Sequence, residues 1–150
     1  MIVWIEKAVV LLLHDRQIAE HGGSTGLRDE GLLESALARP QQLYAYGDPP
    51  PDLADLAASL AHGLAKNHAF VDGNKRTAYV SYRSFLELNG AELDASAEDK
   101  YVTILGLAES RISEAEFADW LRAHLHIESG GAVQETRARY AAKKRTRQRA

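Results

Sequence analysis

Two apolar runs with helical periodicity, separated by one short polar segment, constrain this chain more than any other feature. In residues 53–64, leucine and alanine recur at three- and four-residue intervals, and residues 78–88 repeat this spacing with larger side chains. Pro51 and Asp52 favour a helix start before the first run, whereas Asn89-Gly90 favours a helix end after the second. We therefore expect two core helices that enter and leave the polar segment between them.

Four further segments carry apolar residues at helical spacing, and no internal repeat is present. The fold that we predict is therefore all-α, a compact bundle of about six helices in a single domain covering residues 1–128. The additional helices are expected at residues 4–20, 27–38 and 97–109, and from the Ser113–Glu116 capping box onward. Residues 129–150 are expected to form a basic C-terminal tail that is either mobile or helical.

Residues 39–51 interrupt the helical pattern with a proline at position 40 and three more at positions 49–51. Because the residue before a proline avoids the helical region, we expect Pro40 to end the second helix. Leu43–Tyr46, followed by Gly47-Asp48, predicts either a small β-hairpin flap, which would dock a partner chain by backbone pairing, or an ordinary connection. Residues 91–94 predict a brief extended piece.

Charge is distributed unevenly along the chain. Of the 18 lysines and arginines, seven lie in residues 136–150, where there is no acidic residue, so residues 1–135 carry 11 basic and 21 acidic side chains. An acidic body does not favour non-specific nucleic-acid binding, because phosphate contacts need clustered cations. Only the tail has the composition to touch nucleic acid or an acidic partner, and the alternative for the tail is a solvated terminus.

Cysteine is absent from the sequence, which excludes disulfide bonds, thiolate catalysis and Cys-ligated zinc. The apolar run Ala8–Leu13 is too short to span a bilayer and is followed by no small-residue cleavage site, so we expect neither membrane insertion nor a signal peptide. A cytoplasmic location is consistent with these observations. His62, His124 and His126 have no third ligand at metal-site spacing, and we expect them to be surface histidines.

The polar segment between the two core helices, residues 68–76, concentrates the reactive side chains, and we call it the motif loop. It feeds the N-terminus of the helix that follows, where unpaired backbone N–H groups and the helix dipole favour an anion. Gly73 allows the backbone to approach a ligand closely, and Lys75 and Arg76 supply positive charge for phosphates. These features predict a phosphate-binding site.

Two further residues of the motif loop indicate chemistry as well as binding. Asp72 is a hard oxygen ligand of the kind that Mg²⁺ accepts beside phosphate, and His68 is the side chain best suited to take a proton near neutral pH. The loop as a whole predicts that a nucleoside phosphate is held while His68 deprotonates an attacking hydroxyl. The alternative is structural, with a helix cap and a core aromatic residue, Phe70, before a basic helix start.

A family resemblance rests on the order of residues in and after the motif loop. His68-Ala-Phe70-Val-Asp72-Gly73-Asn74-Lys75-Arg76-Thr-Ala resembles the signature of the Fic/Doc superfamily in its death-on-curing branch, and residues 26–40 are similar to the N-terminal segment of that branch. The resemblance covers about residues 1–127 and implies a Fic-like helical fold with a flap over the active site. It also implies ATP and Mg²⁺ as cofactors, with His68 as general base, Asp72 as the Mg²⁺ ligand, and phosphates held by Gly73, Asn74, Lys75 and Arg76.

Two positions bear on the reaction that the resemblance implies. Fic enzymes generally transfer an adenylyl group from ATP to a protein hydroxyl, whereas the death-on-curing toxins phosphorylate a threonine of elongation factor Tu and stop translation. Lys75 and Tyr79 stand where adenylyl-transferring members usually have glycine and a second arginine, which favours the kinase. Gly73 favours adenylyl transfer, because Fic enzymes share this glycine and the founding toxin has alanine. We expect a toxin-type kinase acting on a Ser/Thr hydroxyl, with an adenylyltransferase (AMPylator) and a catalytically silent binding module as alternatives.

Regulation is the last expectation that follows from the resemblance. Some family members carry an inhibitory helix with a Ser/Thr-x-x-x-Glu-Gly/Asn motif. The partial match in this chain, Ser110 to Glu114, continues with Ala115 and lies inside the predicted fold. The resemblance therefore implies a separate antitoxin as a partner, in addition to a protein substrate.

Overall fold

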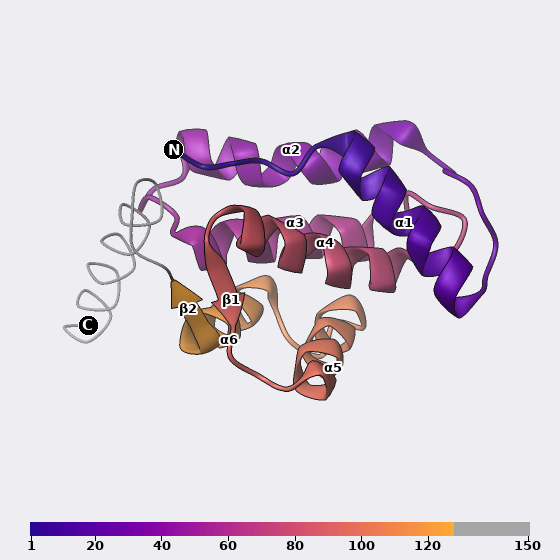
Figure 1. The fold of residues 1–150 in the computed structure, drawn as a ribbon. Helices are drawn as coiled ribbons and strands as arrows, with labels where there is room; N and C mark the ends of the chain where they lie inside the picture. Colours follow the sequence, from indigo (N-terminus) through magenta and orange to yellow (C-terminus); the bar gives the residue numbers. More distant parts are fainter. Residues whose placement is uncertain (128–150) are drawn as a thin grey trace.

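The computed structural model describes residues 1–127, which form six α-helices and one two-stranded antiparallel sheet (Figure 1). The prediction of an all-α bundle of about six helices is confirmed. None of the helices in this part of the chain is long and apolar enough to cross a membrane. The predicted tail, residues 129–150, lies outside the described residues. The elements are α1 (Lys7–His21), α2 (Glu30–Tyr46), α3 (Leu53–Lys66), α4 (Asn74–Leu88), β1 (Ala91–Leu93), α5 (Ala97–Ala108), α6 (Glu114–His124) and β2 (Leu125–Ile127).

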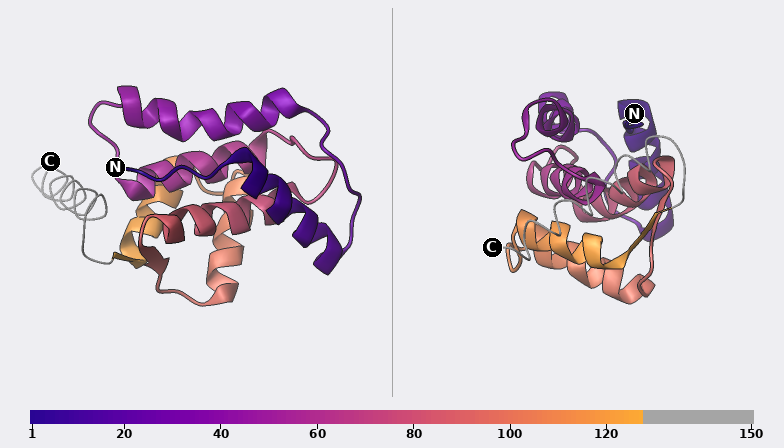
Figure 2. Two further views of the ribbon diagram at one scale, coloured as in Figure 1. Left: turned by 45° about the horizontal axis from the view of Figure 1, so that its top comes forward. Right: turned by 90° about the vertical axis from the view of Figure 1, so that its left-hand side faces the viewer.

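The central element is α3, whose start is fixed by a capping box. The Asp52 carboxylate accepts a hydrogen bond from the Asp55 N–H, and the Asp55 carboxylate accepts one from the Asp52 N–H. Small side chains then allow close helix packing, since a Cβ added at Gly63 would lie 3.0 Å from the Ala36 Cα of α2. As a result, α2, α4 and α6 all pack against α3 (Figure 2).

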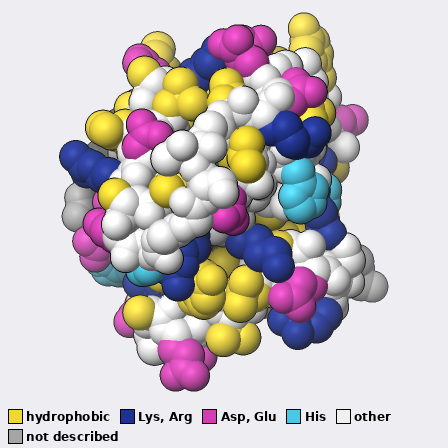
Figure 3. Space-filling view, turned by 90° about the vertical axis from the view of Figure 1, so that its right-hand side faces the viewer, with side chains coloured by type: hydrophobic (Ala, Val, Ile, Leu, Met, Phe, Trp, Pro, Cys, Tyr) yellow, Lys and Arg dark blue, Asp and Glu magenta, His cyan; other side chains and the backbone are white. Residues whose placement is uncertain are grey.

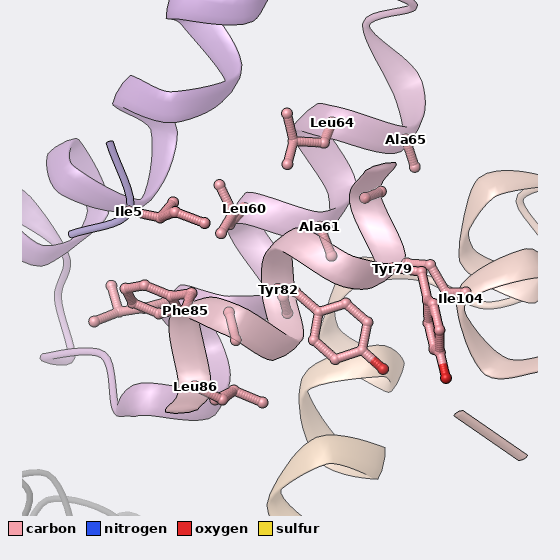
Figure 4. Packing of buried hydrophobic residues seen from close by; sticks show 14 of the residues in the cluster. Ile5, Leu60, Ala61, Leu64, Ala65, Tyr79, Tyr82, Phe85, Leu86 and Ile104 are labelled. Atoms are coloured by element: carbon pink, nitrogen blue, oxygen red, sulfur yellow. The ribbon is translucent and has the colours of Figure 1, made fainter. Parts of the chain in front are cut away.

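The hydrophobic core lies mainly between α3 and α4. Figure 4 shows buried side chains of both helices in one cluster, with Leu60, Ala61 and Leu64 on α3 and Tyr82 and Phe85 on α4. Ile5 from the N-terminal segment and Ile104 from α5 extend the same cluster on either side (Figure 4). This packing holds the C-terminus of α3 and the N-terminus of α4 in fixed positions, and the motif loop connects them.

The predictions for residues 39–51 are wrong in part, because α2 continues through Pro40 to Tyr46. Proline lacks the N–H that would bond to the Ala36 carbonyl, which normally ends or bends a helix. Here Leu33, Ala36 and Pro40 are all buried on one face of α2, and packing of that face against α3 outweighs the missing hydrogen bond. Neither a hairpin nor a flap forms at residues 43–48, where the helix is followed by a connection with a cis Asp48-Pro49 bond.

The small sheet joins two segments that are distant in sequence. β1 confirms the extended piece predicted at residues 91–94, and it pairs antiparallel with β2 so that Ala91 lies opposite Ile127 and Leu93 opposite Leu125. The sixth helix, expected from the Ser113–Glu116 capping box onward, ends at His124, and the next three residues are extended. The pairing attaches the end of α6 to the end of α4.

Candidate active site

The motif loop crosses from the end of α3 to the start of α4, and its last residues form the first turn of α4. Gly73 is the N-cap of α4 and adopts a left-handed conformation with φ +75°. A side chain there would be strained, and its Cβ would lie 3.1 Å from the Ile18 side chain of α1. The first backbone N–H groups of α4 have no acceptor within the helix, so they are available to an anion.

Asn74 holds the loop in shape through its side chain. The Phe70 N–H donates to Asn74 Oδ1 at 3.0 Å, and Asn74 Nδ2 donates to the Phe70 carbonyl at 2.9 Å. Both ends of the amide are therefore engaged within the loop. We predicted that Asn74 binds phosphate, and in this structure its backbone N–H remains the group able to do so.

His14 of α1 packs against the motif loop and was not among the predicted site residues. Its side chain is 2% exposed, its ring stacks on Phe70 with centroids 3.8 Å apart, and its Nε2 lies 2.8 Å from the Asp72 carbonyl oxygen. A carbonyl only accepts, so the neutral ring carries its proton on Nε2. Val10, His14 and Ile18 share the buried face of α1, which is the sequence signal that identifies this histidine.

Asp72 is exposed, with its carboxylate oriented by two backbone N–H groups. Gly73 N–H donates to Oδ1 at 2.8 Å and Ser24 N–H donates to Oδ2 at 3.1 Å. These two hydrogen bonds hold the pKa of Asp72 below its usual value, and the bond from Ser24 has the larger effect. This carboxylate is ionised at neutral pH and retains free lone pairs on both oxygens.

Asp72 fits a Mg²⁺ ion that takes most of its ligands from elsewhere. Residues 1–127 contain no cluster of three His, Asp or Glu side chains able to hold a metal alone. Mg²⁺ is commonly bound by one or two carboxylates together with water and substrate phosphates. The geometry therefore suits a metal that arrives with a nucleotide, and it does not form a complete protein cage.

His68 occupies an unusual backbone position directly after α3. Its φ is +51°, in the left-handed region that non-glycine residues seldom adopt. The side chain is exposed, and within residues 1–127 its imidazole makes no hydrogen bond or ion pair with another side chain. The ring is thus available to a hydroxyl brought by another molecule.

The two cations of the motif each contact residues of other elements. Lys75 Nζ lies 3.9 Å from Glu109 Oε1, near the end of α5. The Arg76 guanidinium lies 4.7 Å from the centroid of the Tyr101 ring of α5, and its Nη1 lies 3.4 Å from His21 Nε2 of α1. Figure 3 shows the corresponding face of the molecule, where Lys and Arg side chains gather beside histidine.

A second segment, residues 22–29 between α1 and α2, covers one side of the motif loop. Leu27 and Phe70 form an isolated antiparallel bridge, and Val71 N–H donates to the Gly26 carbonyl at 3.1 Å. A Cβ at Gly23 would lie 2.7 Å from Asp72 Oδ2, so this close approach requires glycine. The structure thus brings all six predicted site residues together in one loop and helix start, and adds a supporting wall from α1 and residues 22–29.

The chain is similar in sequence to known proteins over much of its length. Residues 4–86 match the model of the Fic/DOC family. The chain is 51% identical over 74 residues to the Toxin Doc of Mycolicibacterium smegmatis, an alignment that covers 49% of this chain and 57% of that relative. It is 37% identical over 118 residues to the Protein kinase doc of Escherichia phage P1, covering 79% of this chain and 92% of the relative. The chain therefore belongs to the Fic/DOC family, in its death-on-curing branch.

Proposed function

We propose that this protein is a toxin-type kinase that transfers the γ-phosphoryl group of ATP to a Ser or Thr hydroxyl of another protein. The observation that carries the proposal is that His68, which is exposed and makes no hydrogen bond or ion pair with another side chain of residues 1–127, lies in the same loop that leads into the N-terminus of α4. The relative from phage P1, which is named a protein kinase, supports the same reaction.

In the proposed reaction, the unprotonated ring nitrogen of His68 takes the proton of the acceptor hydroxyl. The hydroxyl oxygen forms a bond to the γ-phosphorus, the bond from that phosphorus to the β–γ bridging oxygen breaks, and ADP leaves. The backbone N–H groups of α4, together with Lys75 and Arg76, stabilise the spread negative charge. Asp72 would hold Mg²⁺, which would supply further charge neutralisation at the phosphates.

Adenylyl transfer is the second candidate, and Gly73 is the observation that favours it. Transfer from α-labelled and γ-labelled ATP to cell proteins distinguishes the two reactions, because a kinase moves the γ label and an adenylyltransferase moves the α label. We expect only the γ label to move, and we expect His68→Ala to lower the rate by about 10²–10⁴-fold. Full toxicity of His68→Ala would contradict both enzymatic functions and favour a binding module.

We further propose a cytoplasmic acceptor and a separate antitoxin, both on the strength of the family resemblance. Elongation factor Tu is the acceptor that the death-on-curing branch suggests. Mass spectrometry of cell proteins after induction would identify the acceptor by an added phosphoryl mass. Harmless high expression of the intact chain alone would contradict the need for an antitoxin.

A further inference from the structure

The end of α3 exposes three successive backbone carbonyls, and one short segment binds all of them. Arg28 Nε donates to the His68 carbonyl at 2.8 Å, and its Nη2 lies 3.5 Å from the Asn67 carbonyl. The backbone N–H groups of Arg28 and Asp29 donate to the Ala69 carbonyl at 2.8 and 2.9 Å. Residues 28 and 29 therefore determine the direction of the chain immediately before and after His68.

We propose that Arg28 is a positioning residue that keeps His68 in its left-handed conformation and so directs the imidazole toward the acceptor hydroxyl. The inference rests on the proposed function, in which His68 is the general base. A φ of +51° is unfavourable for histidine and persists only where the surroundings impose it. The Nε–H of the charged Arg28 guanidinium donates to the carbonyl of this same residue, which opposes rotation of its backbone.

The location of Arg28 adds an electrostatic reason for this contact. The C-terminus of a helix carries partial negative charge, which a nearby cation stabilises. Arg28 lies at the end of α3, directly over the carbonyls of Asn67 and His68. The guanidinium is therefore attracted to this point by the helix as well as by individual hydrogen bonds.

The phosphate-binding part of the loop has separate supports. Asn74 brackets Phe70, and His14 binds the Asp72 carbonyl. Neither contact involves Arg28. Loss of the Arg28 side chain should consequently disturb the direction of His68 while leaving the start of α4, and with it nucleotide binding, in place.

Kinetics of Arg28→Ala test the proposal. We expect kcat to fall by roughly 10–100-fold, since small misplacements of a catalytic group have effects of this size. The KM for ATP should stay within about twofold, which a general loss of structure would not allow. Arg28→Lys, which offers one charged donor in place of a fork, should recover part of kcat. Arg16→Ala, an exposed arginine of α1, is the matched control and should leave both constants unchanged.

A double-mutant comparison shows whether Arg28 acts through His68. In a His68→Ala background, Arg28→Ala should cause no further loss, because the group that it positions is gone. An equal loss in both backgrounds, or a raised KM for ATP, would mean that Arg28 contacts substrate directly and would overturn the proposal.

A measurement without turnover separates this inference from the proposed function. NMR couplings that report φ at residue 68 should change between the wild-type protein and Arg28→Ala, while those at Asn74 should not. Unchanged couplings at residue 68 would refute the positioning role even in an active enzyme. If the couplings change but no phosphoryl transfer is found, the proposed function fails and the backbone role of Arg28 stands.

Discussion

Replacing Arg122 with methionine tests whether a buried ion-pair network holds α6 against the start of α3. Arg122 Nε donates to Asp52 Oδ2 at 2.7 Å, and its Nη2 donates to Asp52 Oδ1 at 3.0 Å and to Asp55 Oδ1 at 2.9 Å. Its Nη1 donates to Asp119 Oδ1 at 2.6 Å. The side chains of Arg122 and Asp52 are only 6% and 2% exposed. Methionine preserves much of the apolar stem but none of these donors.

The expected magnitude follows from this burial. Removing one member of a buried pair costs about 3–5 kcal/mol, because the remaining charge is uncompensated, whereas an exposed pair contributes about 0–1 kcal/mol. A domain of this size loses roughly 3–5 °C of Tm for each kcal/mol. We therefore expect Arg122→Met to lower the Tm by roughly 10–20 °C. Because native domains have a total stability of about 5–15 kcal/mol, a loss of this size should leave a folded variant whose unfolding can be measured.

The stability difference between the wild-type protein and Arg122→Met should also depend on pH. In the wild-type protein, burial acts to raise the pKa of Asp52, but the hydrogen bonds and charge of Arg122 hold it below its usual value. The lowered pKa means that ionised Asp52 stabilises the folded wild-type protein. This contribution is present above the unfolded-state pKa and is lost as pH falls through the folded-state pKa. Without Arg122, burial raises the pKa of Asp52. As pH falls, protonation of Asp52 therefore removes the cost of burying an unpaired charge. The difference between the two proteins should shrink from about pH 7 to about pH 4.

Urea unfolding of both proteins across this pH range measures the difference directly. Arg111→Met is the matched control, since Arg111 pairs with Glu109 at 3.3 Å while 62% exposed. It should change stability by less than about 1 kcal/mol. Two results would refute the idea that an uncompensated buried carboxylate destabilises the variant. One is that Arg122→Met loses no more stability than Arg111→Met, and the other is that it loses more but by an amount that does not vary with pH.

Two further changes probe the support of the motif loop. His14→Gln keeps an N–H donor for the Asp72 carbonyl and His14→Phe does not, so urea unfolding should find the phenylalanine variant less stable by about 1 kcal/mol; equal stabilities would mean that ring packing dominates. Gly23→Ala places a Cβ 2.7 Å from Asp72 Oδ2, whereas a Cβ at Gly22, also at positive φ, meets nothing within 4 Å. Calorimetric titration with Mg-ATP should show weaker binding for Gly23→Ala than for Gly22→Ala, and equal affinities would contradict a role for Asp72 in holding the metal.

Local sequence pattern predicted the elements whose burial is continuous and missed those that depend on distant contacts. The stripes of α3 and α4 were recognised because leucine and alanine recur at helical spacing over several turns. Pro40 was interpreted as a helix end because its effect on the chain is local, whereas the packing of α2 against α3 is not visible in the sequence. β2 is only three residues long, and it pairs with β1, which is distant in sequence, so that Ile127 lies opposite Ala91. Local sequence pattern does not reveal such a pairing.

The site shows the same division between contiguous and distant residues. His68 and the run from Asp72 to Arg76 were identifiable because they are consecutive and chemically coherent. The groups that orient them come from α1 and the segment after it, where His14 lies in an apolar stripe and Ser24 contributes only a backbone N–H. A backbone donor leaves no trace in residue type, so only the three-dimensional arrangement reveals it.

Tyr79 shows that residues in the first turns of α4 act by packing as well as by charge. Its side chain is 9% exposed and makes edge contacts with Tyr82 at 6.2 Å and Tyr101 at 5.5 Å. Tyr101 in turn lies under the guanidinium of Arg76. An arginine at position 79 would add a cation to α4, but it would also remove the ring that supports Tyr101. Tyrosine at this position therefore supports, through Tyr101, the orientation of the Arg76 guanidinium.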